Sequence, residues 1–131
     1  MSKLVLKNIS RRYGAVEAVA DFSLELREGE FVSLLGPSGC GKTTTLRMIA
    51  GFISPGTGTI EMDGRQISSP SSVVPPEKRR MSMIFQSYAI WPNMTVGENV
   101  GFGLLVRKLS RTEIERRVDA ILDVVQMRSL K

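Results

Sequence analysis

A glycine-rich stretch, GPSGCGKTTT at positions 36–45, constrains the fold of this chain more than any other feature. It follows residues 31–35 (FVSLL), a short and mostly apolar run that predicts a buried strand. It precedes residues 43–53, where apolar residues recur at helical spacing until Pro55-Gly56 ends the pattern. The order strand, glycine loop, helix therefore places the loop at the N-terminus of a helix.

Residues 36–43 match GxxxxGK[ST], the pattern of the phosphate-binding loop or P-loop. Its glycines allow consecutive amide N–H groups to converge on one anion, which the N-terminus of the next helix also favours. Lys42 adds a full charge for the β- and γ-phosphates, and the Thr43 hydroxyl suits Mg²⁺. The alternative, a glycine-rich turn with a surface lysine, leaves the complete motif unexplained. We expect nucleotide binding by Gly36, Pro37, Ser38, Gly39, Cys40, Gly41, Lys42, Thr43 and Thr44.

Cysteine and histidine usage narrows the chemistry further. The single cysteine, Cys40, excludes an internal disulfide, and the absence of histidine removes the commonest metal ligand and general base. A thiolate at Cys40 would be stabilised by the loop, so we predict rapid alkylation there and protection by Mg-ATP. The net charge of +5 comes from basic pairs spread along the chain, so a nucleic-acid-binding stripe is not expected.

The rest of the N-terminal region predicts a small antiparallel sheet. Residues 3–9 and 22–26 alternate between apolar and polar side chains, which indicates half-buried strands. Residues 57–62 are another strand candidate, and Asp63-Gly64 is typical of a hairpin turn. We expect residues 68–76, rich in serine and proline, to form a surface loop.

The remainder of the chain predicts one more strand and two helices. Residues 81–85 form a second buried-strand candidate. Thr95 with Glu98 and Ser110 with Glu113 form two capping boxes. The first opens a weak helix that carries three glycines, and the second opens a better helix whose apolar face comprises Ile114, Val118, Ile121, Leu122 and Val125. The fold class is α/β, with an antiparallel subdomain leaning on the strand before the glycine loop.

Short motifs along the whole chain follow one pattern: RYGAVEAV at 12–19, GPSGCGKTT at 36–44, GF at 51–52, GTI and DG within 58–64, PPEKR at 75–79, FQSYA at 85–89, PNMTV at 92–96 and EN at 98–99. In these motifs the chain resembles the N-terminal part of an ATP-binding cassette (ABC) transporter ATPase, of the type that powers bacterial solute importers. The resemblance implies one domain over 1–131 with a partial P-loop NTPase core. Its β subdomain, P-loop and glutamine loop would reach about residue 94, and a helical subdomain would start at about 95–131.

The resemblance assigns roles to two further residues. Tyr13 would stack on adenine, although its place beside Gly14 also fits the rim of the small sheet. Gln86 would place its amide oxygen near Mg²⁺ or the attacking water, the alternative being a solvated loop residue. Lys42 and Gln86 would then be catalytic, and Thr43 and Gln86 would ligate Mg²⁺. A neutral amide is a weak base, so Gln86 would position water without deprotonating it.

Residues 87–99 resemble the segment that faces the membrane-spanning subunit. Trp91 lies in this segment, and packing in a core explains it equally well.

Three later motifs of the family do not occur within these 131 residues: the LSGGQ signature, the Walker B strand and the switch histidine. Residues 120–123 (AILD) do not supply Walker B because the apolar positions around them have helical spacing. Residues 60–63 (IEMD) fail because Glu61 interrupts the strand and a turn follows. We therefore expect the first half of a nucleotide-binding domain, inactive as an ATPase by itself. Residues 31–35 would keep exposed strand edges unless another chain covers them.

The leading functional hypothesis is an ATP-binding subunit of an ABC transporter that couples Mg-ATP binding and hydrolysis to solute transport. No apolar run approaches the ~20 residues of a membrane helix, so we expect a cytoplasmic protein, peripheral at the inner face of the cell membrane. Its partners would be membrane-spanning subunits and a second nucleotide-binding domain, as a homodimer in the full-length protein.

Three alternatives stay open. One is a non-hydrolysing nucleotide-binding module, and another is an ABC-type ATPase outside transport, such as one of nucleic-acid maintenance. The third is another P-loop class, a small-molecule kinase or a GTPase, although no NKxD motif occurs and Gln86 would be unexplained.

Overall fold

The chain forms two compact units in a computed structural model that describes residues 2–131. The first unit ends at Ile84, and the second comprises Phe85–Lys131. Each is described here by itself.

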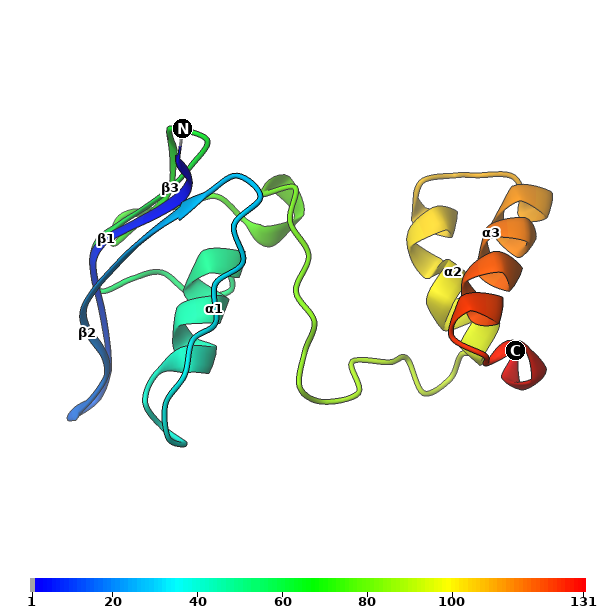
Figure 1. The fold of residues 1–131 in the computed structure, drawn as a ribbon, viewed down its shortest axis with the longest axis horizontal. Coiled ribbons are helices and arrows are strands. Elements are labelled where there is room, and N and C mark those ends of the chain that lie inside the picture. The colour runs from blue at the N-terminus through cyan, green and yellow to red at the C-terminus, as the bar shows by residue number, and fades with distance from the viewer. Residues whose placement is uncertain (1) are drawn as a thin grey trace. The chain divides into compact units, whose positions relative to one another are not determined.

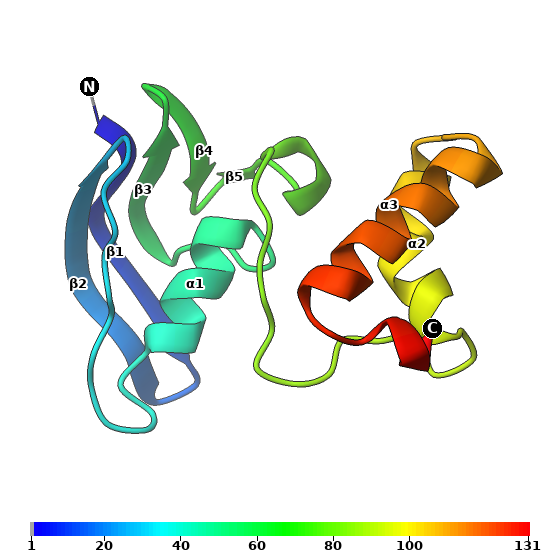
Figure 2. The same ribbon diagram turned by 45° about the vertical axis from the view of Figure 1, so that its right-hand side comes forward.

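The first unit contains a five-stranded antiparallel sheet in the order β2-β1-β3-β4-β5. Strands β1, β2 and β3 are labelled in Figure 1, and β4 and β5 in Figure 2. The expected strands at 3–9, 22–26 and 57–62 are confirmed, and the first two are longer than predicted. The turn at Asp63-Gly64, where both residues have positive φ, joins β3 to β4 as expected. The strands are β1 (Ser2–Tyr13), β2 (Val16–Arg27), β3 (Thr57–Met62), β4 (Arg65–Ser69) and β5 (Ser72–Val73).

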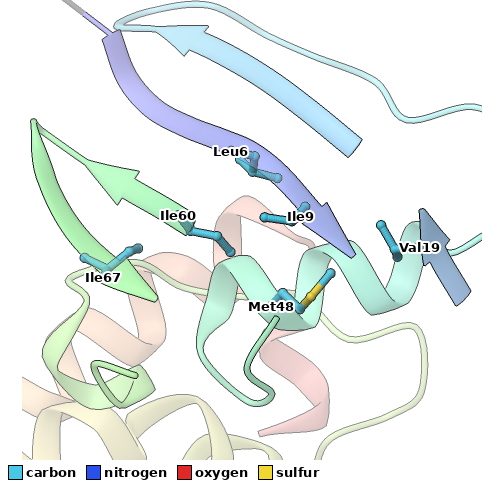
Figure 3. Packing of buried hydrophobic residues seen from close by; sticks show 6 residues of the cluster. All are labelled: Leu6, Ile9, Val19, Met48, Ile60 and Ile67. Carbon is cyan, nitrogen blue, oxygen red and sulfur yellow. The ribbon is translucent and has the colours of Figure 1, made fainter. Parts of the chain in front are cut away.

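Helix α1 (Lys42–Ala50) lies against this sheet (Figure 2) and closes its core. Met48 of α1 is fully buried against β1 and β3, where Leu6, Ile9 and Ile60 are also at most 1% exposed. Figure 3 shows these side chains with Val19 and Ile67 in one cluster. Each such side chain contributes about 1.5–3 kcal/mol of hydrophobic stabilisation, so the cluster fixes α1 to the sheet.

Helix α1 ends three residues earlier than the predicted 43–53. Gly51 has φ 89° and caps the helix, with its N–H directed to the carbonyl oxygens of Arg47 and Met48. The left-handed conformation at Gly51 breaks the helical path, because it turns the chain away from the helix axis. Ile53 still packs against the core, but from outside the helix.

Residues 31–35 and 81–85 were both predicted to be buried strands, and both predictions are wrong for the part of the chain that the structure describes. Phe31 and Leu35 are each 91% exposed, and Ile84 is 97% exposed. Val32 and Leu34 are half-buried, so residues 31–35 turn one face inward in the two-residue period of a strand. A strand also needs a hydrogen-bonding neighbour, and β1–β5 pair with one another instead.

The predicted surface loop at 68–76 is also partly wrong. Strand β4 continues to Ser69, β5 follows, and a 3₁₀ turn covers Pro76–Lys78. Ser68 is 0% exposed and Ser69 is 8% exposed. Their hydroxyl groups accept hydrogen bonds, from Arg79 and from the Ser72 backbone, and this pairing allows polar side chains to be buried.

The second unit is a pair of helices, α2 (Val96–Val106) and α3 (Arg111–Val124), followed by a 3₁₀ turn at Arg128–Leu130. The Thr95–Glu98 capping box is complete. At the second box only the Ser110 side chain accepts its bond, because the Glu113 carboxylate pairs with arginines of its own helix.

The predicted apolar face of α3 is only partly buried. Val118 and Leu122 are each 2% exposed, whereas Ile121 and Val125 are 47% and 53% exposed. Val118 and Leu122 lie four residues apart, one turn of the helix, so the buried stripe on α3 is narrower than the sequence predicted.

Candidate functional site

The glycine loop is fixed against strand β2 at Gly41. Gly41 is the N-cap of α1 and has φ 89°. A Cβ atom there would lie 2.2 Å from the carbonyl oxygen of Ala18 and 3.0 Å from Val19 Cγ2. Both the left-handed conformation and the close approach require glycine. The start of α1 is therefore fixed in position next to Ala18 of β2.

The N-terminus of α1 is arranged to attract an anion. The first amide groups of a helix have no acceptor within the helix, and Gly41 provides no side-chain cap. The first turn also carries no acidic residue that would neutralise the partial positive charge. Thr43 is exposed on this turn, so its hydroxyl group is accessible to a ligand.

The ammonium group of Lys42 lies over the loop. Its Nζ donates hydrogen bonds of 2.7 Å to the carbonyl oxygens of Gly36 and Pro37, and it contacts Cys40 Sγ at 3.2 Å. The Cys40 amide closes the loop from within by a 3.3 Å bond to the Pro37 oxygen. Lys42 thus holds a full positive charge at the carbonyl oxygens of the loop that precedes α1.

The thiol of Cys40 responds to this charge. Its side chain is exposed, and the hydrogen bond from Lys42 holds the pKa of Cys40 below its ordinary value. A lowered pKa increases the thiolate fraction near neutral pH, which is the form that reacts with alkylating agents. The geometry supports the reactivity predicted for this residue.

Tyr13 ends β1, at the same end of the β1–β2 pair as the Gly41 contact. It pairs with Val16 across the hairpin, and Ala18, which touches Gly41, follows two residues later on β2. The ring is 46% exposed, and the Arg11 guanidinium carbon lies 5.3 Å from its centroid. Arg11 therefore covers one face of the ring.

Gln86 is exposed and belongs to the second unit, at the start of an irregular segment. The strand expected before it is absent from the described residues, so a strand end does not fix its orientation. The structure brings Lys42, Thr43 and Cys40 together in one unit with Tyr13, and it leaves the role of Gln86 as a prediction.

A cavity of about 410 Å³ lies between β2 and the glycine loop. Residues 33–35 form one wall, and Cys40, Gly41 and Lys42 form another. No cluster of His, Cys, Asp or Glu suited to a metal ion occurs among the residues that the structure describes. The Thr43 hydroxyl is exposed in the first turn of α1, and an oxygen donor of this kind fits Mg²⁺.

Two residues with extensive hydrogen bonding were missed in the sequence. Arg79 is 3% exposed, and its guanidinium group donates to five oxygen atoms. It stands in the basic run Lys78-Arg79-Arg80, and no local signal separates it from its neighbours. Asn99 holds the backbone of Trp91, Met94 and Thr95 through its side-chain amide.

Trp91 makes one packing contact, and its place in a segment that faces the membrane subunit stays a prediction. Its ring packs on Phe102 of α2, with centroids 4.3 Å apart, and the residue is 45% exposed. In residues 2–131 no helix has both the length and the hydropathy of a membrane-spanning segment.

Known proteins are similar to this chain over nearly its full length. A family model described as ABC transporter matches residues 19–131. The chain is 50% identical over 127 residues to a spermidine/putrescine import ATP-binding protein of Nitrosomonas eutropha, covering 97% of this chain and 34% of that protein. It is 46% identical over 127 residues to an alpha-glucoside transport ATP-binding protein of Rhizobium meliloti, with 97% and 34% covered. It is 45% identical over 132 residues to a trehalose/maltose import ATP-binding protein of Thermococcus litoralis, with 99% and 36% covered. The chain thus spans about a third of the length of the curated relatives it matches.

Proposed function

This chain belongs to the ABC transporter family, and we propose that it is the ATP-binding part of an importer's ATP-binding subunit. In the full-length protein it would couple Mg-ATP binding and hydrolysis to solute transport across a membrane.

The observation that carries the proposal is the loop geometry at the N-terminus of α1. Gly41 lies in close contact with Ala18, and the Lys42 ammonium donates hydrogen bonds to the carbonyl oxygens of Gly36 and Pro37. The helix amides, the macrodipole and the lysine charge all favour one polyanion at this point. In the presence of a nucleoside triphosphate, the Lys42 ammonium would leave the Gly36 and Pro37 oxygens and bind the β- and γ-phosphates of the nucleotide.

The remaining site residues complete this proposal. Thr43 would ligate Mg²⁺, and Thr44 and residues 36–41 would surround the phosphates. Tyr13 would stack on adenine with the face opposite Arg11, because the guanidinium group covers the other face. Gln86 would orient the attacking water beside the metal. The chain itself would bind ATP without hydrolysing it at a rate typical of enzymes.

Partners and location follow from the same proposal. The protein would lie in the cytoplasm at the inner face of the membrane, bound to membrane-spanning subunits and to a second nucleotide-binding domain. Residues 95–131 would begin the helical subdomain of this domain, and residues 87–99 would face the membrane subunit.

The relatives are named for different solutes, a polyamine for one and sugars for the others. Their identity to this chain is nevertheless similar, between 45% and 50%. We infer that this part of the subunit serves nucleotide binding common to these importers and does not select the solute.

Titration calorimetry of the 131-residue chain with Mg-ATP tests the proposal. We expect binding, weaker binding of GTP, and a loss of at least about tenfold in ATP affinity for Lys42→Ala, because a charge-assisted hydrogen bond contributes about 1.5–3 kcal/mol. Lys78→Ala, an exposed lysine of the same unit, is the matched control and should bind as the wild type does. A chain that does not bind Mg-ATP, or an unchanged affinity for Lys42→Ala, would contradict the proposal.

A further inference from the structure

The buried guanidinium group of Arg79 has all of its donors occupied. A guanidinium group has five N–H donors. Here Nε donates to the Val74 oxygen at 2.6 Å, and the two terminal nitrogens make four further bonds. These four bonds reach the carbonyl oxygens of Met48, Ile49 and Ile67 and the Ser68 hydroxyl, at 3.1, 2.7, 3.0 and 2.6 Å.

The four acceptors of the terminal nitrogens come from two elements, α1 and β4, which Arg79 joins. Met48 and Ile49 lie in the last turn of α1, where carbonyl oxygens have no N–H donor four residues further on within the helix. The Met48 oxygen also accepts a 3.2 Å bond from the Gly51 N–H. Ile67 and Ser68 lie on β4. All five acceptors are neutral oxygens, and the positive charge stands at the negative end of the α1 dipole. Arg79 therefore fixes the C-terminal end of α1 to the sheet.

Gly51 makes room for this arrangement. A Cβ atom at Gly51 would lie 2.4 Å from Arg79 Nε and 2.7 Å from its Cζ atom. The glycine that ends α1 therefore also admits the guanidinium group to the helix end.

Helix α1 is short, so its two ends are coupled. It has nine residues, which corresponds to about 13.5 Å at the rise of an α-helix. Its N-terminal end is held at Gly41 against β2, and its C-terminal end is held by Arg79. A shift or rotation at one end moves the other, because the helix in between is a rigid hydrogen-bonded rod.

We propose that Arg79 is the positioning residue of the phosphate-binding loop: by fixing the end of α1 to β4, it sets where Lys42 and the first-turn amides lie. The inference rests on the proposed nucleotide-binding function for its consequence in affinity. Arg79 would touch neither nucleotide nor metal, and it acts only through the helix.

The Cys40 thiol reports on the loop without any nucleotide. Its titratable neighbours are Lys42, at 3.2 Å, and Glu17, which lines the same cavity. Because Cys40 is the only cysteine, the pH profile of alkylation by iodoacetamide measures this one site. The profile depends on the Cys40–Lys42 contact, which a change in fold stability alone does not alter.

The test compares Arg79→Met, Arg79→Lys and Arg80→Met in the 131-residue chain, each verified by circular dichroism to be folded at the temperature used. Methionine keeps the apolar stem without donors, and lysine keeps the charge with three donors for five acceptors. Arg80 is the exposed neighbour and the matched control. For Arg79→Met we expect the alkylation midpoint to move to higher pH and the Mg-ATP dissociation constant to rise about tenfold, because Lys42 is misplaced. Arg79→Lys should lie between, and Arg80→Met should match the wild type.

The inference is overturned if folded Arg79→Met keeps the wild-type alkylation profile and ATP affinity, because Arg79 would then serve stability only. If Arg79→Met does not fold, a wild-type alkylation profile in Arg79→Lys would overturn the inference in the same way. If the wild-type chain fails to bind Mg-ATP, the proposed function fails, and the alkylation profiles still decide the role of Arg79.

Discussion

Strand β1 and residues 31–35 lie in the same compact unit and bury their apolar side chains very differently. Leu6 and Ile9 of β1 are 1% and 0% exposed, whereas Phe31 and Leu35 are each 91% exposed. Strand β1 has a neighbour on both sides, β2 and β3. Residues 31–35 lie outside every strand of the described residues, although one of their faces is half-buried. Backbone pairing, more than apolar character, separates the two segments.

Amide hydrogen exchange gives the largest contrast between them. We expect amides of β1 to exchange through global unfolding and those of residues 31–35 through local fluctuations, a difference of roughly 10³-fold or more for a domain of ordinary stability. Mass spectrometry of peptic fragments would measure both segments in one experiment. Slow exchange at 31–35 at every protein concentration would remove the contrast. Protection that grows with concentration would instead show that a second copy pairs with this segment.

Core truncation gives the next largest effect. Ile60 on β3 is 0% exposed, so Ile60→Ala should lower the free energy of unfolding by about 2–5 kcal/mol through lost burial and a residual cavity. Leu35→Ala is the matched truncation in the unpaired segment and should change it by less than about 0.5 kcal/mol. Urea unfolding followed by circular dichroism measures both. Similar losses for the two variants would mean that residues 31–35 contribute to the core in solution.

The same contrast explains what could be read from the sequence. The β3–β4 hairpin was predictable from its Asp63-Gly64 turn, and the parts of β1 and β2 at 3–9 and 22–26 were predictable because alternation marks their buried faces. The loop was predictable because its glycines and lysine follow a fixed spacing. Residues 31–35 and 81–85 were misassigned because a buried strand depends on partners that a local pattern does not contain. Arg79 escaped prediction for a similar reason: its five acceptors come from three separate stretches of chain.

The second unit offers an intermediate case, an irregular segment that side chains hold in place. The Asn99 oxygen accepts the Trp91 N–H at 2.8 Å, and its nitrogen donates to the Trp91, Met94 and Thr95 oxygens at 3.0–3.1 Å. Asn99→Ala removes these bonds and should cost about 1–2 kcal/mol in the stability of this unit, since several partners stay accessible to water.

Trp91 is the only tryptophan, so its fluorescence during urea unfolding reports on the second unit. Asn99→Asp keeps the acceptor and loses the donor group, so it tests the three bonds that the Asn99 nitrogen donates. It should also be destabilised. If Asn99→Ala unfolds at the wild-type midpoint, the segment is held by something other than Asn99.

The smallest effect concerns the ion pairs of Glu113 with Arg116 and Arg117 on α3. Their contribution to the free energy of unfolding depends on pH in a predictable direction. Hydrogen bonds from Arg116 and Arg117 lower the pKa of Glu113 to about 2. Because the folded pKa lies below the unfolded value of 4.5, the unfolded state binds more protons between these two values. The stabilisation from Glu113 is therefore complete above about pH 5 and is lost as the pH falls toward 2.

The difference in unfolding free energy between wild type and Glu113→Gln, followed by Trp91 fluorescence, should be largest near neutral pH and should vanish in acid. It should also shrink in 1 M NaCl, which screens exposed charges. Glu115→Gln, which removes a pair with Arg111 alone, should have a smaller effect at neutral pH. A Glu113→Gln difference that stays constant from neutral pH to acid would show that the arginines do not hold this carboxylate in solution.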